Sequence, residues 1–172
     1  AVVVSDYGKG AVTRLILDAC SASINASAPV IIDPHPANYD KYNRVFMIKP
    51  NKKEAEAGAN MQITDVESAF KAAQILLDRW QSEYSVITLG GMGVVVLNRS
   101  GSVREHLHAQ TRQVFDVSGA GDCVTAIFAA GLAAELGILE IGEVANLAAG
   151  IVIAEVGTAP ITRKKLLQNI HH

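Results

Sequence analysis

Short runs of β-branched residues alternate along the chain with longer segments whose apolar residues recur at helical spacing. Runs of the first kind predict buried strands, and segments of the second kind predict helices. This alternation is typical of an α/β domain, so we expect a mostly parallel sheet covered by crossover helices. The expected strands are Val2–Ser5, Val30–Asp33, Val45–Lys49, Ser85–Leu89, Val94–Asn98 and Val103–Leu107. The expected helices are Ala11–Ala26, Lys52–Gly58, Val66–Trp80, Ala120–Leu136, Ile141–Val156 and Arg163–Ile170.

Turn and helix-start signals refine this expected architecture. Only short glycine-containing segments separate the last three strands, which predicts that these strands are antiparallel. The helix Val66–Trp80 has the clearest apolar face, and Thr64 with Glu67 predicts a capping box at its start. The helices Ala120–Leu136 and Ile141–Val156 are apolar nearly all round. We therefore expect both to be buried together, with little contact with water.

Composition and charge narrow the classes of protein. The chain has 172 residues, of which 49% are hydrophobic and 19% charged, so we expect one folded domain and exclude intrinsic disorder. A net charge of −2, from 15 basic and 17 acidic residues, leaves no positive excess to hold nucleic acid or an anionic membrane. The apolar runs are interrupted before they reach about 18 residues, so we expect neither a membrane span nor a signal peptide.

The cysteines and histidines carry no metal-binding pattern. Cys20 and Cys123 are too few for a disulfide framework, which favours a reducing, cytoplasmic location. Cys123 lies at an expected helix start, where a thiol can become a nucleophile, but no recognisable dyad motif supplies a base. His106 and His108 alternate along a strand, and we expect both to face solvent rather than to hold a metal.

The stretch from Asp116 to Asp122, Asp-Val-Ser-Gly-Ala-Gly-Asp, is the most informative part of the sequence. It ends where an apolar helix begins, and its small residues let backbone N–H groups converge at the helix N-terminus, where they favour an anion. We interpret it as a phosphate site in which the Asp122 carboxylate accepts a proton from an attacking hydroxyl. The alternative is that Ser118 and Asp122 only cap a structural helix.

Three weaker motifs lie elsewhere in the sequence. Asn51 and Glu54 begin a helix directly after a strand, where open α/β sheets bind ligands, but the pair is also an ordinary helix start. Residues 88–93, Thr-Leu-Gly-Gly-Met-Gly, form either a nucleotide loop or a plain glycine-rich hairpin. Asn146, in an apolar helix, is either a ligand contact or a satisfied buried amide. The absence of G-x-x-x-x-G-K-S/T and of G-x-G-x-x-G argues against a P-loop ATPase and a dehydrogenase.

These motifs, in this order, resemble those of the ribokinase-like (PfkB) carbohydrate kinase family, whose second signature is D-x-x-G-A-G-D before a helix of small residues. The resemblance implies that Asp122 is the catalytic base. It implies that the amides before this base form an anion hole for the transferred phosphoryl group, at Gly119, Ala120 and Gly121. It also implies a monovalent cation, K⁺, beside that hole, held by Asp116, Val117 and Gly157.

The other motifs are similar to the family's ATP site. The segment starting at Asn51 resembles its N-x-x-E motif, in which the Glu organises the ATP phosphates through water and Mg²⁺, here Glu54. The loop after Thr88 resembles its nucleotide loop, and Asn146 matches an Asn near the adenine. The residues that the resemblance assigns to ATP are Asn51, Lys52, Lys53, Glu54, Thr88, Gly90, Gly93 and Asn146.

Two further segments are similar to the heptose 7-phosphate kinase branch of the family. Residues 5–10, Ser-Asp-Tyr-Gly-Lys-Gly, resemble its S-D-Y-x-K-G segment, and residues 32–35, Ile-Asp-Pro-His, resemble its I-D-P-K. This likeness implies substrate contacts by Asp6, Lys9 and Asp33. His35 departs from the pattern, because an imidazole stands where the branch has a fixed positive charge.

The resemblance implies a three-layer α/β/α fold with a mostly parallel sheet, truncated so that the N-terminal half and the β lid are absent. Residues 1–172 would be the C-terminal, ATP-binding part of a sugar kinase domain, consistent with a chain that begins with Ala rather than Met, inside an apolar run. The implied reaction is ATP-dependent phosphorylation of D-glycero-D-manno-heptose 7-phosphate at the anomeric hydroxyl. The product, the 1,7-bisphosphate, would serve ADP-heptose and lipopolysaccharide core synthesis, and the whole enzyme would be a homodimer. Two alternatives stay open: a related kinase for another sugar or sugar phosphate, and a segment that binds nucleotide without turnover.

Overall fold

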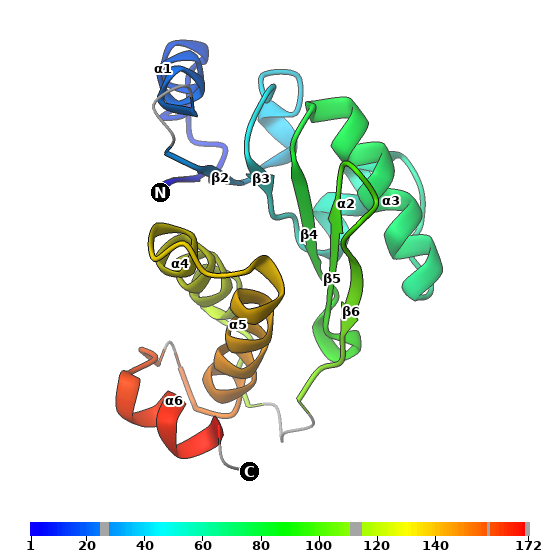
Figure 1. Cartoon of the computed structure of the whole chain (residues 1–172). Coiled ribbons are helices and arrows are strands. Elements are labelled where there is room, and N and C mark those ends of the chain that lie inside the picture. Colours follow the sequence, from blue (N-terminus) through cyan, green and yellow to red (C-terminus); the bar gives the residue numbers. More distant parts are fainter. Residues whose placement is uncertain (25–27, 111–114, 158, 171–172) are drawn as a thin grey trace.

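The computed structural model of the chain describes residues 1–24, 28–110, 115–157 and 159–170. Across these residues the strands form a single sheet whose order follows the sequence (Figure 1). The first four strands run parallel and the last two are antiparallel to their neighbours, as predicted. The strands are β1 (Val2–Ser5), β2 (Val30–Asp33), β3 (Met47–Ile48), β4 (Tyr84–Thr88), β5 (Val94–Asn98) and β6 (Arg104–Leu107).

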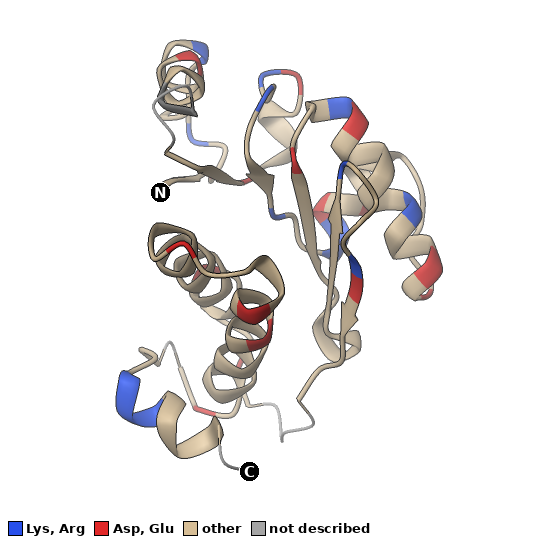
Figure 2. Ribbon diagram, in the orientation of Figure 1, with Lys and Arg blue, Asp and Glu red and all other residues tan. Residues whose placement is uncertain are grey.

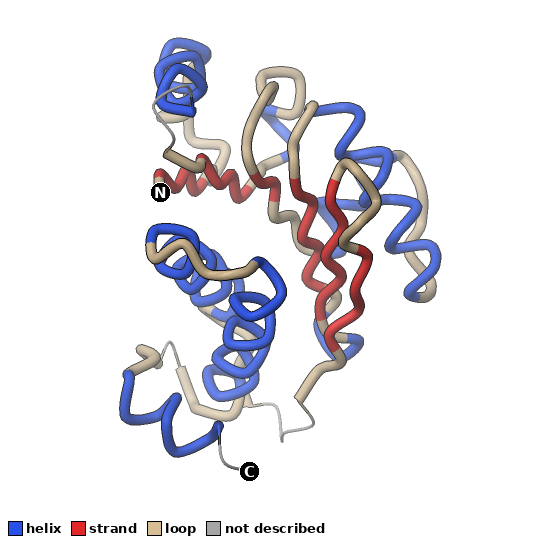
Figure 3. Tube along the Cα trace, in the orientation of Figure 1, coloured by secondary structure: helices blue, strands red, loops and turns tan. Residues whose placement is uncertain are grey.

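Helices cover both faces of this sheet, so the expected three-layer α/β/α architecture is confirmed (Figures 1 and 3). One face packs on α1 (Arg14–Ile24), α2 (Lys52–Ala59) and α3 (Val66–Trp80). The other face packs on α4 (Ala120–Ala133) and α5 (Ile138–Ile153). The last helix, α6 (Arg163–Ile170), packs through Leu166 against α4 and α5. Two short 3₁₀ helices, η1 (Pro36–Asn38) and η2 (Gly90–Met92), lie in the connections.

Each face of the sheet has its own apolar core because side chains alternate along a strand. Ile32 and Ile48 pack under α1–α3 together with Trp80, whereas Ile31 and Met47 pack under α4 and α5 together with Phe128. The sheet is therefore buried on both faces at its centre, as a parallel sheet between helices must be. Edge strand β1 is less covered, since Val3 is 42% exposed.

The start of α3 corrects the expected capping box by one residue. Asp65, not Thr64, is the N-cap: its Oδ1 accepts the Ser68 amide at 2.7 Å, and the Ser68 hydroxyl oxygen accepts the Asp65 amide at 3.0 Å. Glu67 is instead paired with Arg104 of β6 at 2.8 Å. The apolar face of α3 is buried as predicted.

Several element ends differ from the predicted ones for local reasons. β3 has only two residues, and α1 begins at Arg14 rather than Ala11, while the predicted end of α1 at Ala26 lies outside the described residues. α4 ends at Ala133 because Glu135 adopts a left-handed conformation, with φ of 58°. α5 begins at Ile138 because the Glu140 carboxylate accepts the Gly137 amide at 3.1 Å.

The expectation that α4 and α5 are buried together holds for α5 and is wrong in part for α4. Nine residues of α5 are buried, among them Asn146. α4 buries one face, which carries Val124 and Phe128, and exposes a stripe of small residues at Ala126, Ala130 and Ala133. The apolar sequence of α4 therefore overstates its burial.

A group of basic residues lies at the start of the last helix. Figure 2 shows basic residues at the start of α6, where Arg163, Lys164 and Lys165 follow one another. Lys165 is paired with Glu155 at 2.6 Å.

No helix within the described ranges is both long enough and apolar enough to cross a membrane.

Candidate active site

A polar cleft of about 210 Å³ opens at the carboxyl ends of the parallel strands and reaches the start of α4. Pairing of Ser5 with Asp33 across β1 and β2 aligns two of these strand ends. In open α/β sheets, ligands bind at this edge. The residues that line the cleft are Ser5, Asp6, Tyr7, Asp33, Pro34, His35, Lys49, Asn51, Glu54, Thr88, Gly121 and Asp122.

The first turn of α4 forms one wall of the cleft. Gly119 is the N-cap and has φ of 80°, which glycine adopts without strain, and no side chain of the described residues caps the helix. Asp122 lies in the first turn, where its Oδ1 accepts a hydrogen bond of 3.3 Å from the Tyr7 hydroxyl. A helix start without a side-chain cap is suited to an anion. Of the backbone amides in this turn, that of Ala120 donates to the Val117 carbonyl at 3.3 Å. Gly121 and Asp122 line the cleft, and phosphate binding by this turn stays a prediction.

A buried ion pair forms the floor of the cleft. Lys49 Nζ lies 3.0 Å from Asp33 Oδ2, and the lysine side chain is only 2% exposed. The Thr125 hydroxyl, from α4, lies 3.0 Å from the same carboxylate oxygen. A Cβ added at Gly121 would lie 3.8 Å from Lys49 Nζ, so the first turn of α4 passes directly over the ammonium group. The ends of β2 and β3 are therefore joined to α4 by charge and hydrogen bonding.

Asn51 and Glu54 form the opposite wall of the cleft. They make a reciprocal capping box at the start of α2, with Asn51 N–H to Glu54 Oε2 at 2.8 Å and Glu54 N–H to Asn51 Oδ1 at 3.0 Å. Burial raises the pKa of the Glu54 carboxyl above its usual range, and nearby Asp33 adds to the rise, while the Asn51 amide opposes it. The pair therefore caps α2, as the helix-start alternative proposed, and it also lines the cleft, while its role in binding ATP and Mg²⁺ stays a prediction.

Asp6 lines the cleft as a buried residue at the centre of a hydrogen-bond cluster. Its carboxylate accepts bonds from the Tyr42 hydroxyl at 2.6 Å, from Asn38 Nδ2 at 2.7 Å and from the Gly8 amide at 2.8 Å. Burial alone would raise the pKa of Asp6, but these three bonds outweigh it and hold the pKa below its ordinary value. Lys9, also expected at the substrate, is exposed and does not line the cleft.

The residue that departs from the heptose kinase pattern, His35, is held firmly in the cleft wall. Its Nδ1 accepts the Ala37 amide at 3.2 Å, and its backbone amide donates to the Tyr42 hydroxyl at 2.9 Å. Gly8 packs so closely on the imidazole that a Cβ there would overlap the ring. Because Nδ1 accepts the Ala37 amide, Nε2 is the remaining polar atom of the ring.

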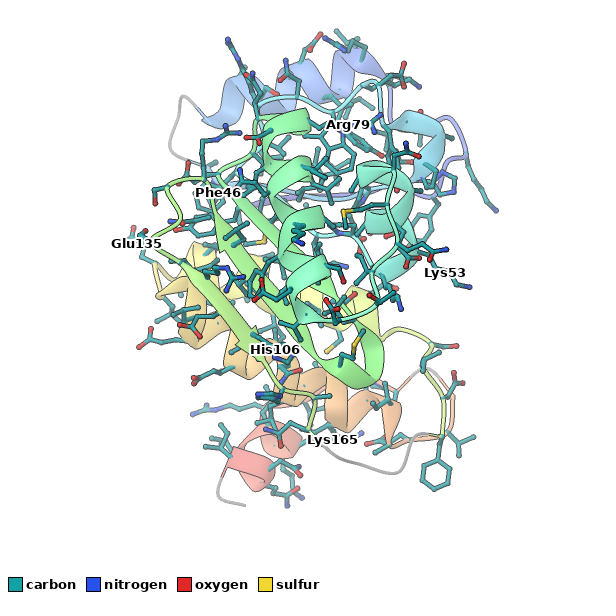
Figure 4. All side chains as sticks on the ribbon, turned by 90° about the vertical axis from the view of Figure 1, so that its right-hand side faces the viewer. Phe46, Lys53, Arg79, His106, Glu135 and Lys165 are labelled. Carbon is teal, nitrogen blue, oxygen red and sulfur yellow. The ribbon has the colours of Figure 1, made fainter. Side chains whose placement is uncertain are left out.

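Some residues assigned to ATP lie outside the cleft. The Lys53 side chain is exposed on the outer surface of α2 (Figure 4), and Lys52 does not line the cleft either. Gly90 begins the η2 turn beyond Thr88 and Gly93 ends it as the C-cap, with φ of 92° and close packing against the backbone at the end of β6. Their role in nucleotide binding stays a prediction.

The end of β6 holds this η2 turn and α5 together. His106 Nε2 lies 2.6 Å from the Met92 carbonyl, so His106 (Figure 4) is half-buried, contrary to the expectation that it faces solvent. His108 is exposed, as expected. The Asn146 amide donates to the His108 carbonyl at 2.7 Å. The buried amide of Asn146 is thus satisfied within the protein, as the structural alternative proposed, and its placement near adenine stays a prediction.

The predicted cation residues meet beside α4. Asp116 Oδ1 accepts the Ser118 amide at 2.8 Å, and the amides of Ser118 and Gly157 lower the pKa of the Asp116 carboxyl. Val117 is 70% exposed on the same turn. Asp116 and Gly157 are therefore neighbours, although about 40 residues separate them in the sequence.

Sequence reasoning missed three residues that lie in the cleft or directly beside it. Tyr7, Lys49 and Thr125 were given no role, although a lysine ending a buried strand and a threonine inside an apolar helix are detectable signals.

Cys123 is buried, and desolvation raises the pKa of its thiol. A thiol in that environment is not activated, so the alternative of covalent catalysis is contradicted.

Comparison with known proteins places the chain among sugar kinases. Residues 1–165 match the family model described as pfkB family carbohydrate kinase. The chain is 39% identical to the bifunctional protein HldE of Methylobacillus flagellatus over 99% of its own length and 35% of that protein. It is 41% identical to the bifunctional protein HldE of Desulfatibacillum aliphaticivorans, over 96% of its own length and 34% of that protein. The chain thus spans about a third of the length of these curated relatives.

Solved structures share its fold. A ribokinase of Arabidopsis thaliana, complexed with ribose and ATP, superposes with a TM-score of 0.81 and 21% identity, over 99% of this chain and 55% of that one. Phosphofructokinase-2 of Escherichia coli, in complex with potassium, gives a TM-score of 0.81 and 20% identity, over 98% of this chain and 55% of that one. The ribokinase-like fold expected from the sequence is therefore confirmed, over about half the length of these kinases.

Proposed function

The chain belongs to the pfkB family of carbohydrate kinases, and on this premise we propose that residues 1–172 are the C-terminal, ATP-binding part of the kinase domain of a heptose 7-phosphate kinase. The proposed reaction transfers the γ-phosphoryl group of ATP to the anomeric hydroxyl of D-glycero-D-manno-heptose 7-phosphate and gives the 1,7-bisphosphate. The observation that carries it is the position of Asp122 in the uncapped first turn of α4, inside the polar cleft. There a carboxylate and an anion-binding turn lie side by side.

Asp122 acts as the general base in this mechanism. Its Oδ2 accepts the proton of the anomeric hydroxyl as that oxygen attacks phosphorus, while Oδ1 keeps the bond from Tyr7. The amides of Gly119, Ala120 and Gly121 stabilise charge on the moving phosphoryl group. Phosphoryl transfer needs little covalent help from the protein, so positioning and electrostatics supply most of the rate.

The cleft residues fit ATP with Mg²⁺. Glu54 and Asn51 present oxygen atoms, which suit a hard cation, and buried Lys49 supplies a fixed positive charge below the anion-binding turn. Among the described residues, no three His, Cys, Asp or Glu side chains are grouped so that they could hold a metal ion by themselves. Glu54 and Asn51 would hold Mg²⁺ in this cleft, and the ion would neutralise charge on the ATP phosphates. We assign K⁺ to Asp116, Val117 and Gly157 on the family resemblance, and the Asp116 carboxylate at this turn supplies a negative charge for such a cation.

Two segments support heptose 7-phosphate as the acceptor. The turn carrying Asp6, Tyr7 and Lys9 follows β1 and resembles the heptose kinase branch, as does the sequence around Asp33. Asp6 shapes this turn through its bond to the Gly8 amide. The proposed substrate contacts are Asp6, Lys9 and Asp33. Asp6 and Asp33 line the cleft, and Lys9 is exposed on the same turn as Asp6.

The test uses the full-length protein that contains these residues. ADP release is measured with heptose 7-phosphate, fructose 6-phosphate and ribose as acceptors, for the wild type and for Asp122→Asn. We expect turnover with heptose 7-phosphate and a fall of at least about 100-fold in Asp122→Asn, the scale on which a general base acts. Turnover restricted to another acceptor would replace the proposed substrate, and Mg²⁺-ATP binding without turnover of any acceptor would overturn the proposed kinase activity.

A further inference from the structure

Thr125 is a polar residue on the buried face of α4, and its hydroxyl shares one proton between two acceptors, one in the same helix and one at the end of β2. Oγ1 lies 3.0 Å from the carbonyl oxygen of Gly121, one turn earlier, and 3.0 Å from Asp33 Oδ2, at the end of β2. The residue is 3% exposed. Threonines in helices commonly bond back to the carbonyl four residues earlier. The second contact, to Asp33 Oδ2 at the end of β2, is not part of this common helical pattern.

The acceptor on the sheet is itself held in place. Asp33 Oδ2 is bonded to Lys49 Nζ at 3.0 Å, and this lysine is anchored at the end of β3 with 2% of its side chain exposed. The Thr125 hydroxyl therefore connects the first turn of α4 to a fixed charge pair rather than to a mobile side chain. Removing the hydroxyl alone would leave the Asp33–Lys49 pair intact.

We infer that Thr125 is a positioning residue: its hydroxyl holds the turn that carries Gly121 and Asp122 at a fixed height above the sheet. The inference rests on the proposed function, because the height of the turn matters only if Asp122 acts on the acceptor. No side chain of the described residues caps this turn, and the Tyr7 bond to Asp122 is exposed to water. The buried hydroxyl is thus the contact suited to restrain it, and a displacement of about 1 Å in a reacting group costs about 100-fold in rate.

Three substitutions separate the hydroxyl from its surroundings. Thr125→Val keeps the shape of the side chain and removes the hydroxyl, whereas Thr125→Ser keeps the hydroxyl and removes a methyl group. Ser85→Ala is the matched control, because the Ser85 hydroxyl of β4 is also buried but has no hydrogen-bond partner within the described residues. Substituting Asp33 or Lys49 would instead leave a buried charge without its partner and mix folding with positioning.

The variants are compared in the full-length protein by steady-state kinetics and by amide hydrogen exchange. In Thr125→Val we expect kcat to fall between about 10-fold and about 100-fold, with both KM values within about 3-fold of the wild type. We expect the amides of residues 120–123 to exchange at least about 10-fold faster in the same variant. Thr125→Ser and Ser85→Ala should stay within about 3-fold of the wild type on both measures.

Two results would overturn the inference. Wild-type kcat with wild-type exchange in Thr125→Val would show that the hydroxyl holds nothing, and equal losses in Thr125→Val and Thr125→Ser would assign the effect to packing. If the wild type phosphorylates no acceptor, the proposed function fails. The exchange of residues 120–123 still decides the inference in that case, because it reports the restraint of the turn without any turnover.

Discussion

The Tyr7 hydroxyl donates to Asp122 Oδ1 at 3.3 Å, although 115 residues separate the two in the sequence. The bond joins the turn after β1 to the first turn of α4 across the mouth of the cleft. It therefore occupies one oxygen of the proposed base and leaves the other free for the acceptor.

Removal of this bond is expected to have a moderate effect. Tyr7 is 64% exposed, and the net contribution of one such hydrogen bond is about 1 kcal/mol, so Tyr7→Phe should lower kcat by less than about 10-fold. Asp122→Asn should lower it by at least about 100-fold. Steady-state ADP release from the full-length protein measures both. A loss in Tyr7→Phe as large as that in Asp122→Asn would contradict the assignment of Asp122 as the base.

The buried pair of Lys49 and Asp33 predicts an asymmetry in stability. Asp33→Asn leaves the ammonium group, 2% exposed, without its counter-charge and should reduce the free energy of unfolding by about 3–5 kcal/mol. Lys49→Met should cost less, because Asp33 is 19% exposed and keeps the Thr125 hydroxyl. Urea unfolding of both variants tests this order. Equal losses, or the reverse order, would show that the pair is more hydrated than its burial indicates.

The cluster around Asp6 predicts a stability effect that depends on pH. The pKa of Asp6 is lowered in the folded state, so its ionised form stabilises the protein above the unfolded pKa of about 3.9, and this contribution is lost as pH falls through the lower folded pKa. Tyr42→Phe removes the 2.6 Å bond to this carboxylate and should cost about 1.5–3 kcal/mol at pH 7. The difference from wild type should shrink as pH falls from about 4 toward 3. A constant difference in urea unfolding across that range would contradict this account.

A substitution at Glu54 can separate the effect of its negative charge from its role in capping α2. In Glu54→Gln the amide oxygen can still accept the Asn51 N–H, so the capping box of α2 survives while the carboxylate is lost. The thermal stabilisation by Mg²⁺-ATP should therefore shrink, as mass action requires when affinity falls. Glu143→Gln on α5 makes the same change at an exposed site away from the cleft and should leave that stabilisation unchanged. Equal ligand-induced shifts in the two variants would remove Glu54 from the nucleotide site.

The same carboxyl fixes the direction of the pH dependence. The pKa of Glu54 is raised in the folded state, so its protonated form stabilises the fold below the unfolded pKa, and this stability is lost as pH rises through the folded pKa. Glu54→Gln should then be no less stable than wild type at pH 7. Stabilisation by Mg²⁺-ATP needs the ionised form of Glu54. As the pH falls, this stabilisation should therefore weaken at a higher pH than it would if the carboxyl were exposed and had its ordinary pKa. Thermal scans between pH 4 and about 7.5, with and without ligand, measure both trends.

The amino-acid sequence by itself determined the alternation of strands and helices, the antiparallel direction of the last strands and the two helix-start motifs at Asn51 and Gly119. These features depend on periodicity and on neighbours within a few residues, so contiguous sequence contains them. At the start of α3, Thr64 and Asp65 are both residue types that cap helices, and the backbone geometry decided that Asp65 is the N-cap.

The tertiary structure alone decided which side chains share the cleft. Asp33 and Thr125 stand 92 residues apart, and nothing local to either predicts their bond. Burial of Lys49 and Cys123, and exposure of one face of α4, likewise depend on which elements pack alongside. Spacing within a motif records local geometry, whereas contacts between motifs arise only when the sheet brings the ends of its strands together.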